Sequence, residues 1–269
     1  MNILGDTIQK IASEKAGIIK ASVPAVIGET QDIIKQIFID KAKNENAPLF
    51  FADEKRKLMN WSWHKHLLKI EYSKEGHTDH EKWECGLTGI YQVKNVVTVL
   101  ETCEQLQQRG WRINEKDIKT GLKNVKKLTG LHGRWEMIHQ SPAVIIDVAH
   151  NAEGVDQLVQ QIELTPHRLL HIIFGMVKDK DAEEILRLFP KTANYYFTKA
   201  QIPRALPESE LAEKANKAGL QGTVYPDVNT ALSTAIRHAH PDDLIIVCGS
   251  VFLVGEINMS ILPAAAMHT

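Results

Sequence analysis

The chain has 269 residues, of which 43% are hydrophobic and 24% are charged, a composition typical of a globular protein with one large or two ordinary domains. Its formal net charge of -1 gives no electrostatic support for a nucleic-acid or membrane-surface partner. No apolar run approaches the roughly 20 residues that a membrane-spanning helix needs, and charged residues interrupt the pattern of an export signal near the N-terminus. The three cysteines are far apart and have no CxxC spacing, which favours reduced thiols and a cytoplasmic location.

The first half of the chain mixes short strand candidates with helices. Residues 4–20, LGDTIQKIASEKAGIIK, have a helical pattern with too few residues before them for a strand that could position the helix. An apolar strand candidate at 22–29 and a helix at 32–43 follow. Residues 73–82 are charged and rich in histidine, which predicts an exposed hairpin or loop. Two further helices are expected, one ending near Gly110 and one capped by Asn114.

From about Leu131 the pattern changes to short apolar runs separated by amphipathic stretches. The runs are AVIIDVAHN, RLLHIIFGM, ANYYFTKA and DLIIVCGS, and helices are expected at 152–163, 179–189, 207–218 and 228–240. Apolar strands that alternate with helices predict an α/β fold, here a doubly wound, Rossmann-like and mainly parallel sheet covered on both faces. In such sheets ligands bind beyond the carboxyl ends of the strands, so we expect the chemistry at that edge.

Two polar clusters lie at this edge or close to it. Asp147 follows three apolar residues, with His150 and Asn151 in the turn that opens the next helix. A carboxylate there can hold a ribose hydroxyl or a cation; alternatively, Asp147 only caps the turn and His150 is a solvated loop residue. Arg134, in GRW just before the domain, can bind phosphates bidentately or can be an ordinary surface arginine.

A set of motifs runs in order from Leu4 to Glu256: LGDTIQKIASEKAGIIK, GIYQVKNVVTVLE, GRWEMI followed by DVAHN, FGMVKDKD, TKAQIPRAL and CGSVFLVGE. Each motif is weak alone, but the ordered set is specific. With it the chain resembles the folylpolyglutamate synthase/dihydrofolate synthase family of the Mur ligase superfamily. The resemblance covers nearly the whole chain.

The resemblance implies a domain organisation. Residues 1–130 match the C-terminal remnant of the central ATPase domain, and residues 131–269 match the Mur ligase C-terminal Rossmann-like domain. Family members carry a GTNGKGS-type phosphate loop in the ATPase domain, but this sequence has neither that loop nor a GxxxxGK[ST] pattern. In the family, the LGDT segment lies well inside the ATPase domain. We therefore expect an N-terminally truncated member that is inactive alone, because it lacks a cradle for the β- and γ-phosphates.

The resemblance also implies a reaction. ATP, with magnesium, phosphorylates the carboxylate of a pteroate or folate, and the amino group of L-glutamate attacks the resulting acyl phosphate to form an amide. The physical chemistry fits, because a carboxylate is a poor electrophile and phosphate is a good leaving group. The implied activity is that of an ATP-dependent folate ligase, a monomer when full-length, with no nucleic-acid or membrane partner.

Five residues take roles from the resemblance. Lys15, in EKAGI, matches a catalytic lysine that is carbamylated by carbon dioxide and then binds the second magnesium ion. Arg134 and Asp147 match ATP contacts. His150 and Ser250 match positions that help to place glutamate, and His150 is also a catalytic candidate. The sequence departs from the family pattern at Tyr91 and Ala152, which removes no charge that the mechanism needs.

Simpler interpretations remain open beside these roles. Lys15 is otherwise a surface lysine, and Ser250 a helix N-cap. The histidines at 64, 66, 77 and 80 lack the frame of a zinc site. A nucleotide-binding oxidoreductase is disfavoured because no GxGxxG follows a candidate strand. The alternative function is a non-catalytic fragment that binds glutamate or a partner, or half of a split ligase that associates through an apolar surface left by the missing part.

Overall fold

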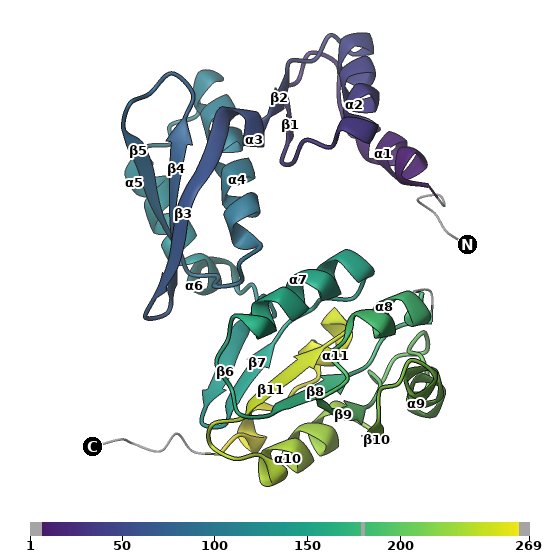
Figure 1. Ribbon diagram of the computed structural model, residues 1–269. Helices are drawn as coiled ribbons and strands as arrows, with labels where there is room; N and C mark the ends of the chain where they lie inside the picture. The colour runs from purple at the N-terminus through teal and green to yellow at the C-terminus, as the bar shows by residue number, and fades with distance from the viewer. Residues whose placement is uncertain (1–6, 179–180, 264–269) are drawn as a thin grey trace. The chain divides into compact units, whose positions relative to one another are not determined.

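The structure, a computed structural model, describes residues 7–178 and 181–263. The chain divides into two compact units, Met1–Gly130 and Leu131–Thr269, and each is described by itself. Figure 1 shows the first unit in purple to teal and the second in teal to yellow. Within the described ranges, no helix is long and apolar enough to cross a membrane.

The N-terminal unit begins with a small parallel α/β layer. Helices α1 (Ile8–Ala16) and α2 (Asp32–Asn44) alternate with strands β1 (Ala25–Ile27) and β2 (Leu49–Phe51). Thr7 caps α1 by accepting a hydrogen bond from the backbone N–H of residue 10 at 3.2 Å. The strands pair in parallel, and among the described residues no third strand joins their sheet. One face of this sheet packs against a small core of residues from and next to the two helices: Ala12, Ala16, Ile19, Phe38 and Ala42.

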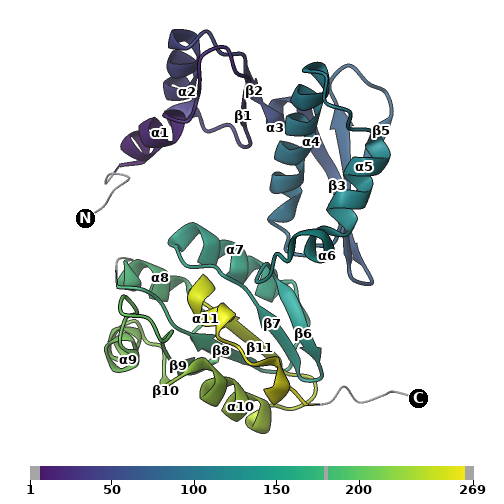
Figure 2. The same ribbon diagram turned by 180° about the vertical axis from the view of Figure 1, so that it is seen from behind.

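The rest of this unit is a three-stranded antiparallel sheet covered by helices. Its elements are α3 (Ala52–Lys55), β3 (Arg56–His64), β4 (Leu67–Lys74), β5 (His80–Cys85), α4 (Gln92–Gln108), α5 (Glu115–Lys123) and α6 (Val125–Thr129). Figure 2 shows α4 and α5 over one face of the sheet. Alternate residues of β4 are buried there, which is the period-2 pattern of a half-covered sheet: Leu68, Ile70 and Tyr72. Residues 73–82 form the predicted exposed hairpin, in which cross-strand pairing continues to Ser73 and His80.

The C-terminal unit alternates strands and helices. Its elements are β6 (Glu136–Gln140), β7 (Ala143–Ile146), α7 (Ala152–Glu163), β8 (Leu170–Phe174), α8 (Ala182–Leu188), β9 (Asn194–Phe197), α9 (Glu208–Lys217), β10 (Gly222–Val224), α10 (Val228–His238), β11 (Leu244–Cys248), α11 (Val251–Gly255) and a 3₁₀ turn at Met259–Ile261. The strand order is β10-β9-β8-β11-β7-β6, and every pairing is parallel except that of β6 with β7. The predicted α/β fold with a mainly parallel sheet is therefore confirmed.

Both faces of this sheet are covered, as the apolar strands required. The buried residues of α7, α8 and α9 form one core, and those of α10 and α11 form the other. In Figure 1, α7 and α8 lie on one side of the sheet and α10 on the other. Strands β8 and β11 are buried along their whole length. The helix expected at 179–189 begins with residues outside the described range, and its described part is α8.

Candidate functional site

Four of the five predicted site residues lie in the C-terminal unit, beyond the carboxyl ends of β7 and β11 or beside them. These strands are neighbours, and the N–H of Asp147 continues their ladder by donating to the Val247 carbonyl at 3.0 Å. Asp147 directly follows β7, and Ser250 follows β11 by two residues. The parallel sheet therefore brings Asp147 and Ser250 to the same edge, because parallel strands end on one side.

Asp147 is buried, and its carboxylate organises the loops around it. Its Oδ2 accepts a hydrogen bond from the N–H of Trp135 at 2.8 Å, and its Oδ1 accepts one from the N–H of Ala149 at 2.9 Å. The first bond ties the residue after Arg134 to the end of β7, which places the GRW segment beside Asp147. Arg134 and Asp147 therefore share one site, and Asp147 also caps its turn as the simpler interpretation expected.

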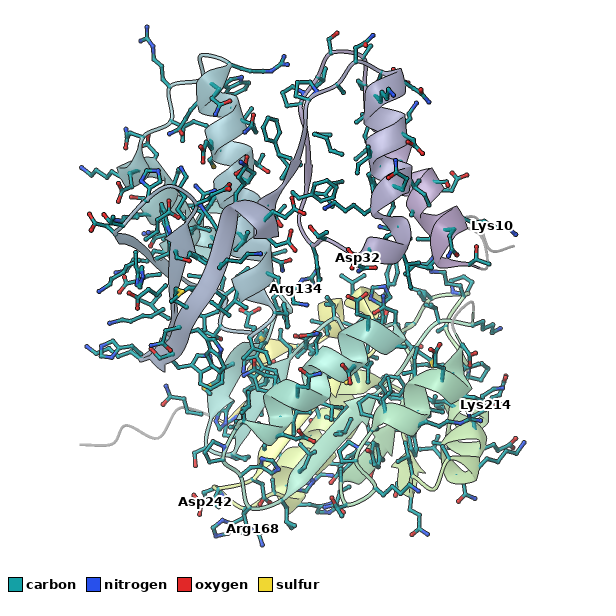
Figure 3. All side chains as sticks on the ribbon, turned by 45° about the horizontal axis from the view of Figure 1, so that its top comes forward. Lys10, Asp32, Arg134, Arg168, Lys214 and Asp242 are labelled. Carbon is teal, nitrogen blue, oxygen red and sulfur yellow. The ribbon has the colours of Figure 1, made fainter. Side chains whose placement is uncertain are left out.

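The GRW segment has a strained backbone. Trp135 is buried and has a φ of +47°, a left-handed conformation that costs a residue with a Cβ free energy. Gly133 has a φ of +74°, and a Cβ there would lie 2.7 Å from Cγ1 of Val148. Packing of Trp135 and its bond to Asp147 hold this conformation. The half-buried Arg134 donates from Nη1 to the Gly133 carbonyl at 3.3 Å, and Figure 3 labels it at the opposite end of the unit from Arg168.

His150 and Asn151 open α7. His150 is exposed, and its Nδ1 lies 2.9 Å from the Val148 carbonyl oxygen, to which it can donate a hydrogen bond. Asn151 caps α7 by accepting from the N–H of Gly154 at 2.8 Å. An exposed His150 fits the simpler interpretation of a solvated loop residue, and its predicted role toward glutamate stays a prediction. The N-cap role of Asn151 was missed, although Asn three residues before Gly154 fits a cap.

The turn after β11 carries Ser250. Its Oγ accepts from the N–H of Phe252 at 3.1 Å, so Ser250 is the N-cap residue of α11 that the sequence indicated. Gly249 has a φ of +112°, and a Cβ there would lie 2.4 Å from the Gly175 carbonyl oxygen. Only glycine fits this close approach of two backbones. Burial and the nearby Asp147 carboxylate raise the pKa of the Cys248 thiol well above its ordinary value, which disfavours the reactive thiolate.

Lys15 lies in the N-terminal unit, in the last turn of α1, with an exposed side chain. The other four predicted site residues belong to the C-terminal unit. The exposure of Lys15 leaves its ε-amino group accessible to solution reagents such as carbon dioxide. No group of three or more metal-ligating side chains was found among residues 7–178 and 181–263.

A cleft of about 930 Å³ in the N-terminal unit contains none of the predicted residues. It lies between β3–β5 and α5 and is lined mainly by lysines and glutamates. Several of these pair with one another, as Lys123 does with Glu84 at 2.7 Å. Because its charges are compensated internally, the cleft is a weaker candidate than the edge around Asp147.

Comparison with known proteins gives a family match and a set of similar chains. Residues 133–251 match the family described as Mur ligase, glutamate ligase domain. The chain is 25% identical over 261 residues to the dihydrofolate synthase/folylpolyglutamate synthase of Bacillus subtilis, covering 96% of this chain and 59% of that protein.

Solved structures give the same result. Escherichia coli FolC in complex with DHPP and ADP superposes with a TM-score of 0.76 and 26% identity, over 94% of this chain and 56% of that one. The folylpolyglutamate synthase of Thermotoga maritima gives a TM-score of 0.71 and 29% identity, over 94% and 57%. The chain thus spans less than two thirds of the length of these relatives. Residues 133–251 thus match the Mur ligase, glutamate ligase domain family, and almost the whole chain is similar to part of folylpolyglutamate/dihydrofolate synthases.

Proposed function

We propose that this chain is part of an ATP-dependent ligase that adds L-glutamate to dihydropteroate or a folate. The observation that carries the proposal is the gathering of Arg134, Asp147 and Ser250 at one edge of the parallel sheet, within the stretch that matches a glutamate ligase domain. Relatives with that activity in their names match almost the whole chain, and FolC was solved with ADP.

The N-terminal unit is, in this proposal, the C-terminal part of the ATPase domain. Among the described residues, its parallel sheet has only two strands, with helices packed on it. A two-stranded sheet has marginal stability by itself. Several apolar side chains of this layer are exposed: Ile8 at 45%, Ile18 at 80%, Val23 at 48% and Ile33 at 71%. In the proposal, the remainder of the ATPase domain, on the same polypeptide or on another, covers these open strand edges and exposed apolar side chains.

The residues present fit one end of a nucleotide. Arg134 is half-buried beside Asp147, so its guanidinium can hold phosphate oxygens, while a carboxylate at a strand end suits a ribose hydroxyl. The sequence has no phosphate loop for the β- and γ-phosphates. A magnesium ion would supply charge neutralisation for the phosphates, and a carbamylated Lys15 would be its ligand from this chain. His150 and Ser250 would orient the glutamate amine, and the imidazole of the exposed His150 would accept its proton.

Binding of ADP tests the nucleotide role. We expect the 269-residue chain to bind ADP weakly in isothermal titration calorimetry, and Arg134→Ala to weaken binding at least tenfold, because the guanidinium supplies charge-assisted hydrogen bonds. Arg187→Ala, which changes an exposed arginine of α8, is the matched control. Equal affinities of wild type and Arg134→Ala would remove Arg134 from the site.

The second candidate function is that of a non-catalytic fragment that binds a partner. Its support is limited to the exposed apolar side chains of the N-terminal layer. It predicts concentration-dependent association without ADP binding, so the same titration, together with sedimentation at several concentrations, separates the two candidates.

A further inference from the structure

The loop after β9 is fixed against the other loops of the site. The Arg204 carbonyl accepts from the N–H of Lys178 at 3.0 Å, and the N–H of Leu206 donates to the Met176 carbonyl at 2.8 Å. At its other end, the N–H of Gln201 donates to Oε1 of Glu256 at 2.7 Å. The loop is therefore tied both to the segment that follows β8 and to the residues that follow α11.

This loop places the Arg204 guanidinium over an exposed aromatic ring. Its Cζ lies 4.8 Å from the ring centroid of Phe252, and the Phe252 side chain is 39% exposed. Phe252 is the residue whose N–H donates to Oγ of Ser250. The stacked pair consequently lies next to the serine that the family resemblance associates with glutamate.

The guanidinium of Arg204 keeps its hydrogen-bonding edge available. Between residues 7–178 and 181–263 it has no hydrogen bond or ion pair, whereas the buried Arg56 is held by three carboxylates. Stacking on a ring uses the face of a guanidinium and leaves its in-plane N–H groups free. An arginine held in this way is pre-oriented to bind a planar oxyanion by donating two parallel hydrogen bonds to it.

Strand order places the Arg204 guanidinium near the proposed nucleotide contacts. Arg204 belongs to the loop after β9, but it stacks on Phe252, which follows β11, and β11 pairs with β7, the strand that Asp147 follows. Neighbouring strands lie about 5 Å apart. A substrate bound by Arg204 would therefore lie beside a nucleotide bound at Asp147.

We propose that Arg204, oriented by Phe252, binds a carboxylate of the incoming L-glutamate. The inference rests on the proposed function, because it takes a dicarboxylic amino acid as the second substrate. Phe252 is a positioning residue in this arrangement, and the contact to substrate is made by Arg204.

The test uses the full 269-residue chain and saturation-transfer NMR with L-glutamate as the probe, in parallel with ADP. Wild type is expected to bind glutamate, and Arg204→Ala to weaken that binding at least tenfold while ADP affinity stays the same. Arg204→Lys keeps the charge but not the bidentate fork, and Phe252→Leu keeps an apolar side chain but not the ring. Both are expected to fall between wild type and Arg204→Ala, and Arg187→Ala is expected to match wild type.

The outcomes are distinct. Glutamate binding that is absent in wild type, or unchanged in Arg204→Ala, overturns the inference, and in either case retained ADP binding leaves the nucleotide role intact. Weaker binding of ADP or of inorganic phosphate by Arg204→Ala, with glutamate unaffected, would make Arg204 a phosphate contact and also overturn the inference. Circular dichroism of each variant confirms that the fold is retained.

Discussion

The Arg56→Ala variant is expected to lower the free energy of unfolding of the N-terminal unit by about 3–5 kcal/mol. Arg56 is 5% exposed and pairs with three carboxylates: Glu81 at 2.8 Å, Glu101 at 3.1 Å and Glu104 at 2.9 Å. Glu101 is only 2% exposed, so removal of the guanidinium leaves a buried charge that still accepts a hydrogen bond from the neutral amide of Gln105 at 2.8 Å. An uncompensated buried charge is the reason for the large effect.

Urea unfolding followed by tryptophan fluorescence measures this loss, because four of the five tryptophans lie in residues 1–130. Lys57→Ala is the matched control, since Lys57 is the next residue of β3 and is exposed; it should change stability by no more than about 0.5 kcal/mol. Arg56→Lys keeps one charge but cannot meet three carboxylates together, so an intermediate loss is expected. A loss below about 1 kcal/mol for Arg56→Ala would show that the cluster does not hold β3, β5 and α4 together.

The second large effect is expected at the amino-terminal end of the other sheet, where Asp243→Asn should cost about 2–4 kcal/mol. The fully buried carboxylate accepts from Nε and Nη2 of Arg168 at 2.9 and 3.1 Å, from the N–H of His240 at 2.7 Å and from the N–H of Leu169 at 3.1 Å. His171, also buried, lies 3.2 Å from Oδ2. An amide offers one acceptor oxygen and turns N–H groups toward these donors, so several charge-assisted bonds are lost.

The same carboxylate gives the stability a defined acid dependence. Burial alone would raise the pKa of Asp243, but hydrogen bonds from His240, Arg168 and His171 outweigh it and lower the pKa to about 2. Because the folded-state pKa is below the ordinary value of 3.8, the contribution is complete above about pH 4 and is lost as the pH falls through about 2. Asp243→Asn should remove this dependence.

Thermal unfolding at pH 7 and at steps down to pH 2 compares Asp243→Asn with a neighbouring control. Asp242→Asn changes an adjacent carboxylate whose side chain is 78% exposed, and Figure 3 shows Asp242 beside Arg168 at this end of the unit. The control should keep both the stability and the pH profile of wild type. Equal melting temperatures for the two variants would contradict the structural role of Asp243.

The sequence predicted the C-terminal unit well because local rules govern it. Apolar runs of strand length, each followed by an amphipathic stretch, fixed β7, β8, β9 and β11 and the helices between them. Ser250 and Asn114 were identified as caps from their side chains and positions alone. Strand β10, with three exposed residues, carried no apolar run, and β6 is antiparallel and only partly buried, so both were missed.

Other features depend on contacts between distant residues. The pairing of Arg56 with Glu101 joins residues 45 positions apart, and that of Arg168 with Asp243 joins residues 75 apart. Nothing local distinguishes these charges from surface ones. The left-handed backbone of Trp135 and the stacking of Arg204 on Phe252 likewise become visible only when the loops at the sheet edge are placed. Asp147 could be chosen as a candidate from the sequence because ligands bind at strand ends in this fold.

The most direct test of the proposed function is glutamate addition by the native polypeptide that contains this sequence, purified from its own cells and assayed by mass spectrometry beside the 269-residue chain. We predict ATP- and magnesium-dependent addition of glutamate to dihydropteroate or tetrahydrofolate by the native material, on a polypeptide or complex larger than 30.3 kDa, and none by the 269-residue chain. Failure of the native material to extend either substrate would contradict the ligase assignment. Product formed by the 269-residue chain alone would contradict the need for a separate phosphate-binding part.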